Sequence, residues 1–510
     1  MEMPMQIGAK SKYTRFFEDR KYFWFFLIAL TVWRLIYIFI IPITPQEAYY
    51  WYYSKYPALS YFDHPPMAAY SIWLGTHLFG NTIFGVKFMG VLWGLLTNIL
   101  LYFTTLRAVQ HLDSDPDFQN YLAFMVVILF NLTIFAHLYS VTIMPDTPLM
   151  FFWLLTIYFI QEWIISAKNY YWLLAGLALG LGMVSKYTAI ALVPAFFVYL
   201  LLSKKGRRQL VTPWPYLALI IVFVVFSPVI YWNAMHNWAS FIFQFGDRAK
   251  SVTHFGMKYF GVLIGSQLFL LTPFIFVLFF VGFVKFVKCF QQERAAAFFY
   301  LTSFFIIGGF TLLSFETLIK MNWLLPGYLG VLIATALING PRWKVKSRLF
   351  KAGVYSSLVL IILAHLVLLI PNIPLGEGNT WSGWKDAAQN IQTLQQKSGG
   401  VEKCFIFTNS YKSAALLKFY LPDQQDTYCK NVYGQPALQF AFWPLPNNLA
   451  GKDAIFVFDN RKEYNNDLDK VNPYFDSIEL LQKFEYKFLN KYSARTIYCY
   501  YARNYHLSAK

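Results

Sequence analysis

The sequence predicts an α-helical polytopic membrane protein with a small α/β domain at its C-terminal end. Three observations support this fold class: an apolar composition, apolar segments that recur at the length of a bilayer crossing, and a change of character after about residue 370. Of the 510 residues, 57% are apolar and the mean hydropathy is +0.41, whereas soluble domains average about 45–50% apolar residues. The chain is therefore too apolar for a soluble enzyme of this length.

The charge and aromatic content fit a membrane protein better than a nucleic-acid binder. Aromatic residues make up 20% of the chain and its formal net charge is +17. Trp and Tyr collect where a membrane meets water, and Lys and Arg in short loops set the orientation of the spans. Many of the basic residues lie in such loops, so we expect no nucleic-acid partner. None of the four cysteines forms a C-x-x-C pair, which argues against a zinc module.

Apolar segments of spanning or near-spanning length occur eleven times, if the two short segments around Ser185 are counted separately. About 20 apolar residues cross a hydrocarbon core of about 30 Å, and a signal-peptide core is shorter. The first segment follows a basic N-terminus and precedes no small-residue cleavage site, so we expect it to be retained. The segments are 22–42, 84–106, 119–140, 147–166, 171–185, 187–202, 214–231, 259–284, 297–314, 321–339 and 352–370.

The basic loops predict the orientation, because Lys and Arg concentrate on the cytoplasmic side. With the N-terminus inside, every strongly basic short loop falls on that side, and eleven spans place the C-terminus outside. The acidic 107–117 loop is an exception, but acidic residues count little in this rule. The basic residues are Lys204, Lys205, Arg207, Arg208, Lys285, Lys288, Arg294, Arg342, Lys344, Lys346, Arg348 and Lys351.

Two domains are expected, a membrane domain over residues 1–370 and an outer-face α/β domain over residues 371–510. In the second, charges are frequent and short β-like runs alternate with helical stretches. Its length of about 140 residues is ordinary for a domain. Three cysteines lie in this disulfide-permissive compartment, where one bridge can form, for example Cys404–Cys429.

The first outer loop, residues 43–80, contains the most informative polar residues. It is too rich in Pro and polar residues to span, and two short interfacial helices fit it best, with Tyr49–Tyr53 as a membrane-level belt. Glu47 and Asp63 then lie at the bilayer surface, where a carboxylate is costly unless it is paired, solvated or bound to a cation. Alternatively, Glu47 completes a first helical turn and Asp63 caps the helix that starts at Pro65.

Asp146, in Met144-Pro145-Asp146-Thr147-Pro148, opens the fourth span on the outer side. An N-cap role is the plain interpretation of an Asp in this position. The functional interpretation rests on coincidence, because Glu47, Asp63 and Asp146 fall on one face at one depth. Three converging carboxylates can hold a divalent cation through oxygen ligands.

Lys186 lies between two short apolar segments at their outer end, against the prevailing charge bias. It either snorkels to the interface or binds an anionic ligand such as a lipid phosphate. Weaker candidates of the same kind occur in two other outer loops. They are Arg248, Lys250, His254, Lys258 and Lys320.

The order of these motifs resembles the GT-C glycosyltransferases of bacteria, of the family 39-like type that includes protein mannosyltransferases and aminoarabinose transferases. The resemblance covers nearly the whole membrane part and is specific for the family rather than for a substrate. The matching stretches are Gln46-Glu47-Ala48-Tyr49-Tyr50-Trp51, Tyr61-Phe62-Asp63-His64-Pro65-Pro66, Pro145-Asp146-Thr147-Pro148, Gly176 through Lys186-Tyr187, Pro228 through Asn233, and Asn322-Trp323-Leu324-Leu325-Pro326.

The resemblance implies a GT-C fold that transfers a sugar, with inversion, from a polyprenyl-phosphate donor to a lipid, glycan or protein acceptor at the outer face of the bacterial inner membrane. The family's first-loop Asp-Glu pair reads Gln46-Glu47 here, and a neutral amide cannot take a proton from an acceptor hydroxyl. Either Glu47, Asp63 or Asp146 replaces it, or the acceptor is already anionic, or the chain has lost activity. The same three carboxylates are the implied metal ligands.

On the donor side, the implied phosphate-binding residues would neutralise charge on the departing lipid phosphate. They are Lys186, His64, Tyr187, Arg248 and Lys320. Two other functions are kept as alternatives: a lipid or polysaccharide transporter, and a catalytically inactive assembly subunit of the same fold. A transporter would show paired repeats and ionisable residues deep within several spans, whereas the candidates here cluster at one surface.

Overall fold

The computed structural model describes residues 19–110, 115–247, 256–288, 294–340, 347–373, 381–459 and 467–508. Arg248 lies outside these residues, as do Lys250 and His254. The chain forms two compact units. The first, here called the helical unit, comprises Met1–Tyr37 and Lys87–Ala364, and the second, the mixed unit, comprises Ile38–Val86 and His365–Lys510. The expected boundary at residue 370 therefore does not separate the compact units, because the first outer loop groups with the C-terminal part.

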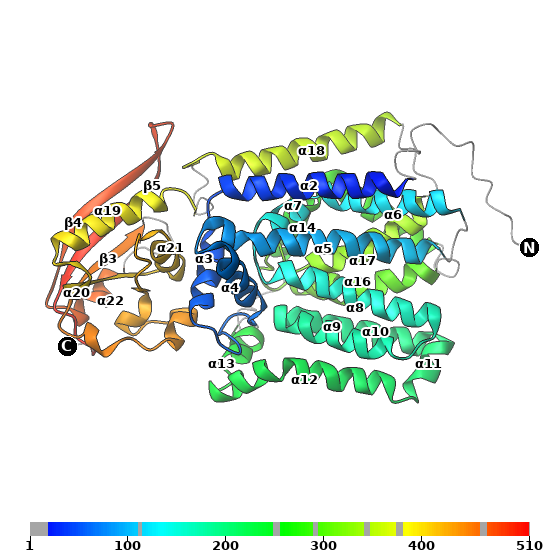
Figure 1. Ribbon diagram of the computed structural model, residues 1–510, viewed down its shortest axis with the longest axis horizontal. Helices are drawn as coiled ribbons and strands as arrows, with labels where there is room; N and C mark the ends of the chain where they lie inside the picture. Colours follow the sequence, from blue (N-terminus) through cyan, green and yellow to red (C-terminus); the bar gives the residue numbers. More distant parts are fainter. Residues whose placement is uncertain are drawn as a thin grey trace, which may run out of the picture. The chain divides into compact units, whose positions relative to one another are not determined.

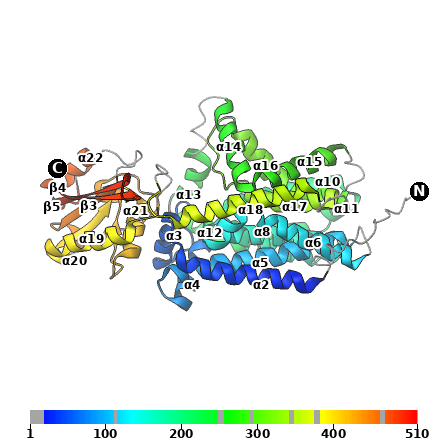
Figure 2. The same cartoon turned by 90° about the horizontal axis from the view of Figure 1, so that it is seen from above.

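Helices that run side by side build the helical unit, as Figures 1 and 2 show. Its first helix, α2, continues into the mixed unit by three residues, and α18 by five. The elements are α2 (Arg20–Ile40), α5 (Ile83–Val109), α6 (Pro116–Asn131), α7 (Ile134–Val141), α8 (Asp146–Ser166), α9 (Tyr171–Ser185), η1 (Tyr187–Ala191), α10 (Leu192–Leu202), α11 (Lys204–Leu210), α12 (Trp214–Met235), α13 (Ala239–Phe241), η2 (Ile242–Asp247), α14 (Met257–Leu271), α15 (Pro273–Lys288), α16 (Arg294–Leu313), α17 (Leu325–Asn339) and α18 (Arg348–Leu369).

The chain is a multi-pass membrane protein. Within the described residues six helices are long and apolar enough to cross a membrane, or up to nine if each of three bent helix pairs is one span. Each of the eleven predicted segments coincides with a helix or a bent pair, but α9 and α17 have only 15 residues each. The fold class is confirmed, and the count of eleven spans stays a prediction.

The chain bends by 76° between α6 and α7. A buried arginine of the first span forms hydrogen bonds at this bend. Arg34 of α2 is only 1% exposed, and its Nη2 donates to Asn131 Oδ1 at 2.8 Å. Asn131 in turn donates to Asn98 Oδ1 of α5 at 2.6 Å. A broken helix leaves backbone groups that water cannot satisfy inside a bilayer. Arg34 Nη2 also donates to the Ala136 carbonyl of α7 at 3.5 Å, so this side chain contacts both sides of the break.

The two ends of α8 differ in charge chemistry. Asp146 begins the helix, and its 21 residues rise by about 30 Å. At the other end, Arg107 Nε donates to Glu162 Oε1 at 2.7 Å, and Lys205 Nζ donates to the Ile164 carbonyl at 2.7 Å. Arg107 and Lys205 thus contact the end of α8 opposite Asp146. Arg342, Lys344 and Lys346 lie outside the described residues, and the orientation stays a prediction.

The mixed unit contains the predicted α/β domain. Its five-stranded sheet has the order β2-β1-β3-β5-β4. The strands β2, β1 and β3 are parallel, whereas β5 pairs antiparallel with both β3 and β4. The elements of the domain are α19 (Trp384–Lys397), α20 (Gly400–Lys403), β1 (Cys404–Thr408), α21 (Tyr411–Tyr420), β2 (Thr427–Tyr428), η5 (Lys430–Tyr433), η6 (Leu438–Phe442), η7 (Asn447–Leu449), β3 (Asp453–Asp459), α22 (Leu468–Val471), η9 (Asn472–Tyr474), β4 (Ser477–Phe488) and β5 (Tyr492–Arg503).

The first outer loop forms two helices, α3 (Pro45–Lys55) and α4 (Met67–Phe79), but the expected aromatic belt on α3 is wrong. The side chains Tyr49–Tyr53 are all buried, because α3 packs against α21 and hydroxyls of this run find acceptors within the mixed unit. For example, Tyr52 donates to the Thr427 carbonyl at 3.0 Å. The exposed apolar side chains lie on α4 instead, among them Trp73 and Leu78.

The expected disulfide is also absent, since Cys404, Cys429 and Cys499 are free and buried. The register explains the result. Phe407 of β1 lies opposite Tyr428 of β2, so Cys429 follows opposite Thr408, four residues from Cys404. Four residues of strand span about 13 Å, far more than the roughly 4.4–6.8 Å between Cα atoms that a disulfide allows.

Candidate functional site

A buried ion pair occupies one end of the helical unit, where α9 is interrupted. The helix ends at Ser185, and Lys186 has extended backbone (φ −160°, ψ 136°) before η1 begins. The Lys186 Nζ lies 2.7 Å from Asp146 Oδ1, and the two side chains are only 8% and 2% exposed. At this break the Lys186 side chain points into the protein and meets a carboxylate. A lysine on the exposed surface of a continuous helix would point into the surroundings instead.

Asp146 is held through both of its oxygens. Asn322 Nδ2 donates to Oδ2 at 2.7 Å, in addition to the Lys186 contact at Oδ1. The plain N-cap interpretation is wrong, because Pro145 is the N-cap of α8 and no side chain caps the helix. Removing one member of a buried ion pair typically costs about 3–5 kcal/mol, so this trio is both a stability element and a charged centre.

The other predicted phosphate-binding residues of the helical unit lie in different surroundings. The Tyr187 hydroxyl is 2.8 Å from Ser240 Oγ, and its ring is buried. Lys320 is exposed, two residues before Asn322. Arg248 lies outside the described residues.

Asp63, in the mixed unit, is held by tyrosine hydroxyls. It is 7% exposed, Tyr49 donates to its Oδ1 at 3.2 Å, and Tyr53 donates to the same oxygen. Burial, followed by the charge of Asp63, raises the pKa values of both phenols well above their usual value. The hydroxyls therefore stay protonated and remain donors. Asp63 does not cap α4, which begins at Met67 without a side-chain cap.

Gln439 of η6 contacts this cluster and was not among the residues predicted from the sequence. Its side-chain Oε1 accepts the Phe62 N–H at 2.7 Å, and its backbone N–H donates to the Tyr49 hydroxyl at 3.0 Å. A residue from the C-terminal part thereby contacts both the neighbour of Asp63 and one of its donors. No local pattern marks Gln439, because the contact joins residues 377 positions apart.

The two other first-loop candidates have different partners. Glu47 is fully buried and forms a capping box, in which its Oε2 accepts the Thr44 N–H at 2.9 Å. The structure thus favours its helix-completing role. Gln46 Nε2 donates to the Tyr411 hydroxyl at 3.2 Å, and the His64 ring lies edge-on to Tyr50, with ring centroids 5.8 Å apart.

The three carboxylates do not fit the predicted cation site. No group of three or more His, Cys, Asp or Glu side chains in the described ranges could hold a metal ion. The contacts argue the same way, because Asp146 accepts from an ammonium and an amide, Glu47 from a backbone N–H, and Asp63 from two hydroxyls. Each partner places a proton where a cation would bind, so the structure lends the metal prediction no support.

Known proteins share this architecture and part of this sequence. A family model described as dolichyl-phosphate-mannose-protein mannosyltransferase matches residues 63–232, the stretch that contains Asp63, Asp146 and Lys186. The lipid A galacturonosyltransferase RgtD of Rhizobium johnstonii is 25% identical over 219 residues, which are 41% of this chain and 43% of that protein. The match thus spans less than half of this curated relative.

Two solved structures of ArnT from Cupriavidus metallidurans share the fold over almost the whole chain. The apo structure has a TM-score of 0.63 at 13% identity and covers 94% of this chain and 98% of ArnT. The structure bound to undecaprenyl phosphate has a TM-score of 0.62 at 14% identity, covering 93% and 97%. The chain therefore has an ArnT-like GT-C fold, as the motifs predict. Within that class its similarity is to lipid A galacturonosyltransferase in sequence and to ArnT in fold.

Proposed function

We propose that the protein transfers a sugar, with inversion, from a polyprenyl-phosphate donor to a lipid, glycan or protein acceptor. The observation that carries this proposal is the buried Lys186–Asp146–Asn322 cluster at a helix break, in a fold shared with a protein that binds undecaprenyl phosphate. The similarity to a lipid A galacturonosyltransferase favours a lipid-linked acid sugar and a lipid A-like acceptor among the alternatives.

On the donor side, Lys186 is proposed to neutralise the departing lipid phosphate. An ammonium has three N–H donors, and Asp146 takes one of them. Asp146 and Asn322 fix the direction of the lysine, so that its charge is already in place when negative charge develops on the leaving group. His64, Tyr187, Lys320 and Arg248 remain predicted contributors to phosphate binding.

On the acceptor side, Asp63 is proposed as the general base when the acceptor is a hydroxyl. Gln46 cannot take a proton, Glu47 caps α3, and the charge of Asp146 is paired with Lys186. Asp63 is the remaining candidate, and the two tyrosine hydroxyls hold it in one orientation. If the acceptor is a phosphate, it is already anionic and needs no base.

The cellular setting is proposed on the charge distribution. The basic end of the bundle, with Arg107 and Lys205, is assigned to the cytoplasm of a bacterial inner membrane. The N-terminus is then cytoplasmic, and the end with Asp146 and the C-terminal domain lie on the periplasmic or extracellular side.

The experiment is a transfer assay in nanodiscs. The purified protein is given polyprenyl-phosphate-linked galacturonic acid, aminoarabinose or mannose as donor and lipid A as acceptor, and products are identified by mass spectrometry. We expect transfer from one donor, about a 100-fold or greater loss in Lys186→Ala, and an unchanged rate in Lys168→Ala, an exposed lysine between α8 and α9.

Two results would contradict the proposal. Equal rates for wild type and Lys186→Ala would remove the donor-site assignment. The absence of both transfer and donor hydrolysis with every donor would favour a transporter or an inactive assembly subunit. The inactive subunit is an alternative because Gln46 stands at the family's acidic position.

A further inference from the structure

A group of aromatic rings in the mixed unit reaches the surface directly after η6. Trp443 is half-buried, and its indole stacks on the buried ring of Tyr52, with centroids 4.9 Å apart and an interplanar angle of 20°. Tyr56, which is 40% exposed, lies beside this stack, since its ring centroid is 5.3 Å from that of Trp443 and 5.8 Å from that of Tyr52. Tyr52 covers one face of the indole, so the accessible surface of Trp443 is on the other face and along the ring edge. Trp443 and Tyr56 are here called the aromatic patch.

Two hydrogen-bonding groups at the aromatic patch have capacity for a ligand. The Asp426 side chain is 38% exposed, and its Oδ1 accepts from Lys418, Tyr52 and Tyr56. Within the described residues its Oδ2 accepts from Tyr56 alone, at 2.7 Å, although a carboxylate oxygen can accept two hydrogen bonds. The Trp443 indole N–H forms no hydrogen bond in the described part of the chain. The patch therefore offers one acceptor and one donor beside a flat ring.

The carboxyl at the patch carries a negative charge. Burial acts to raise the pKa of Asp426, but hydrogen bonds from Lys418 and Tyr56 outweigh it and keep the pKa below its usual value. Asp426 is therefore an anion at neutral pH, and its free lone pair can accept a proton donor from a ligand.

The segment that carries Trp443 also contacts the Asp63 cluster. Gln439, four residues earlier, accepts the Phe62 N–H at 2.7 Å. The Trp443 ring contacts that of Tyr53 edge-on, with centroids 5.8 Å apart, and the Tyr53 hydroxyl donates to Asp63. One tyrosine ring thus separates the aromatic patch from the proposed base, and all of these residues belong to the mixed unit.

These features match a sugar ring better than a phosphate or an acyl chain. The C–H groups on one face of a pyranose carry partial positive charge, and the face of an aromatic ring is negative. A sugar hydroxyl can also donate to Asp426 and accept from the Trp443 indole. An ionised phosphate would be repelled by the carboxylate, and an acyl chain would use neither polar group. Aromatic surfaces with a few polar groups that fix orientation are typical of small-molecule sites.

We propose that the aromatic patch binds a sugar ring of the acceptor, stacked on Trp443, with one of its hydroxyls donating to Asp426. This inference rests on the proposed function and narrows it, because it selects a saccharide-bearing acceptor over a protein. The stacked ring holds the acceptor on the side of the mixed unit where Asp63 takes the proton.

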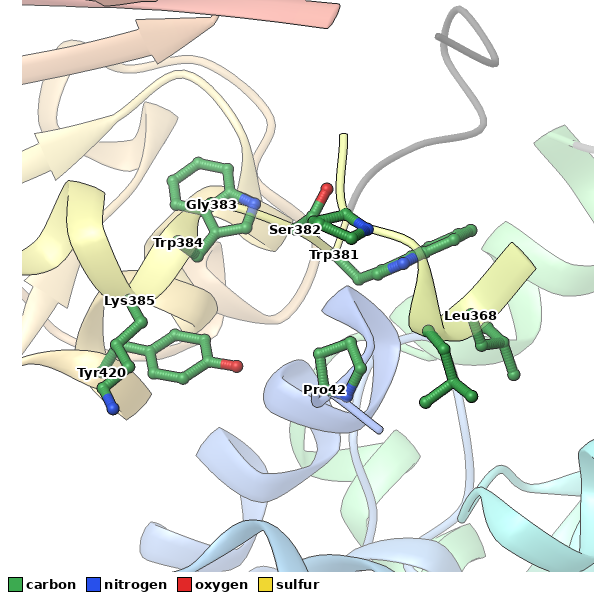
Figure 3. Close-up of a pocket in the computed structure, with 10 residues that line it drawn as sticks. Pro42, Leu368, Trp381, Ser382, Gly383, Trp384, Lys385 and Tyr420 are labelled. Carbon is green, nitrogen blue, oxygen red and sulfur yellow. The ribbon is translucent and has the colours of Figure 1, made fainter. Parts of the chain in front are cut away.

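A pocket of about 250 Å³ elsewhere in the mixed unit supplies a control residue. Figure 3 shows it between the end of α18, the segment that follows α2, and the start of α19. Lys385, the charged residue among those that line it, directs its ammonium away from the others. Trp381 lines this pocket and is half-buried like Trp443, but no lining residue belongs to the aromatic patch.

The first test measures saccharide binding without any donor. Saturation-transfer difference NMR is recorded on the full-length protein in nanodiscs with three probes: gentiobiose, a disaccharide of two pyranose rings; mannitol, a polyol without a ring; and a short peptide that contains serine. The variants are Trp443→Ala, Trp443→Phe and Asp426→Asn, and the control is Trp381→Ala.

We expect gentiobiose to bind through its ring C–H protons, and mannitol and the peptide to bind far more weakly. Loss of the ring in Trp443→Ala should weaken gentiobiose binding about tenfold. Trp443→Phe keeps a smaller ring and Asp426→Asn removes the charged acceptor, so each should cost about threefold. Trp381→Ala should bind like wild type.

The second test uses the transfer assay with lipid A as acceptor. Because a stacking contact binds the acceptor before and during the reaction alike, Trp443→Ala should raise the acceptor KM about tenfold with kcat unchanged. Hydrolysis of the donor in the absence of acceptor should be the same as in wild type.

The proposal is overturned if gentiobiose does not bind the wild type, or binds Trp443→Ala equally well. It is also overturned if mannitol or the peptide binds as tightly as gentiobiose, or if Trp381→Ala weakens binding as much as Trp443→Ala. Saccharide binding that depends on Trp443, in a protein that transfers from no donor, would support the site and contradict the proposed function, so the two can fail separately.

Discussion

The two compact units each bury a carboxylate, and they compensate its charge in different ways. In the helical unit, Asp146 pairs with the ammonium of Lys186 at 2.7 Å and with the amide of Asn322. In the mixed unit, Asp63 accepts from the hydroxyls of Tyr49 and Tyr53. Asp146 thus has a cationic partner, and Asp63 has two phenol hydroxyls among its donors.

This difference separates two chemical roles. A carboxylate that is paired with a cation is stabilised as an anion and is a poor proton acceptor, so Asp146 serves to hold Lys186. A carboxylate that accepts from two neutral hydroxyls is held in one orientation by their dipoles. The comparison therefore supports the proposed division of roles, in which Lys186 of the helical unit stabilises charge and Asp63 of the mixed unit takes the proton.

The largest expected effect concerns Asp63 and depends on the acceptor. Asp63→Asn keeps an oxygen for the tyrosine hydroxyls but cannot take a proton, so transfer to a hydroxyl acceptor should fall by about 10²–10⁴-fold. Transfer to a phosphate acceptor should be nearly unchanged. Initial rates with both acceptor types measure this, with Asp469→Asn, an exposed residue of α22, as the control. An equal loss with both acceptors would show that Asp63 is not a base.

The second prediction tests whether charge pairing between Lys186 and Asp146 stabilises the helical unit. Lys186→Ala leaves Asp146 buried without its cation and should lower the free energy of unfolding by about 3–5 kcal/mol. The double variant Lys186→Met with Asp146→Leu removes both charges and should recover most of that loss while remaining inactive. Unfolding curves in mixed micelles check the order of the three proteins. A double variant as unstable as Lys186→Ala would show that packing, and not charge, governs the site.

The sequence predicted the helical unit better than the mixed unit, for a physical reason. A bilayer crossing imposes a length and a composition on each segment, so the spans could be located without knowing their neighbours. The same logic placed Asp146 and Lys186 at the outer ends of their spans, and the structure shows the two side chains in contact. Asn322 was quoted only as part of a family stretch, and its contact with Asp146 needs the packed bundle.

The first outer loop shows where such reasoning fails. The aromatic run Tyr49–Tyr53 has the composition of an interfacial belt, but its rings are buried because α21 covers the helix. Partners that come from hundreds of residues away, such as Gln439 and Tyr411, leave no periodic trace in the sequence. The local interpretation of Glu47 as part of a helical start was sound, because a capping box depends on neighbours alone.

A smaller effect is expected at Gln439, and it tests whether this residue positions Asp63. Gln439→Leu removes the acceptor of the Phe62 N–H and should cost about 1–3 kcal/mol of stability. Because Phe62 precedes Asp63, kcat for a hydroxyl acceptor should fall about tenfold while KM for the donor stays the same. Gln439→Glu keeps an acceptor oxygen and should restore most of the rate. A change in donor KM, or no rescue by Glu, would contradict a positioning role.

The smallest effect appears only in alkali and tests whether the Asp63 donors are protonated phenols. Burial raises the pKa values of Tyr49 and Tyr53 well above those of unfolded tyrosine, which are about 10. Above pH 10 the unfolded chain binds fewer protons than the folded one, so stability is complete below pH 10 and falls as pH rises toward the folded pKa values. Each buried phenol contributes a slope of about 1.4 kcal/mol per pH unit in that range. Tyr53→Phe should therefore flatten the alkaline decline by that amount, and Tyr492→Phe, exposed on β5, should not. An unchanged slope in Tyr53→Phe would mean that its hydroxyl is not the protonated donor that holds Asp63 in place.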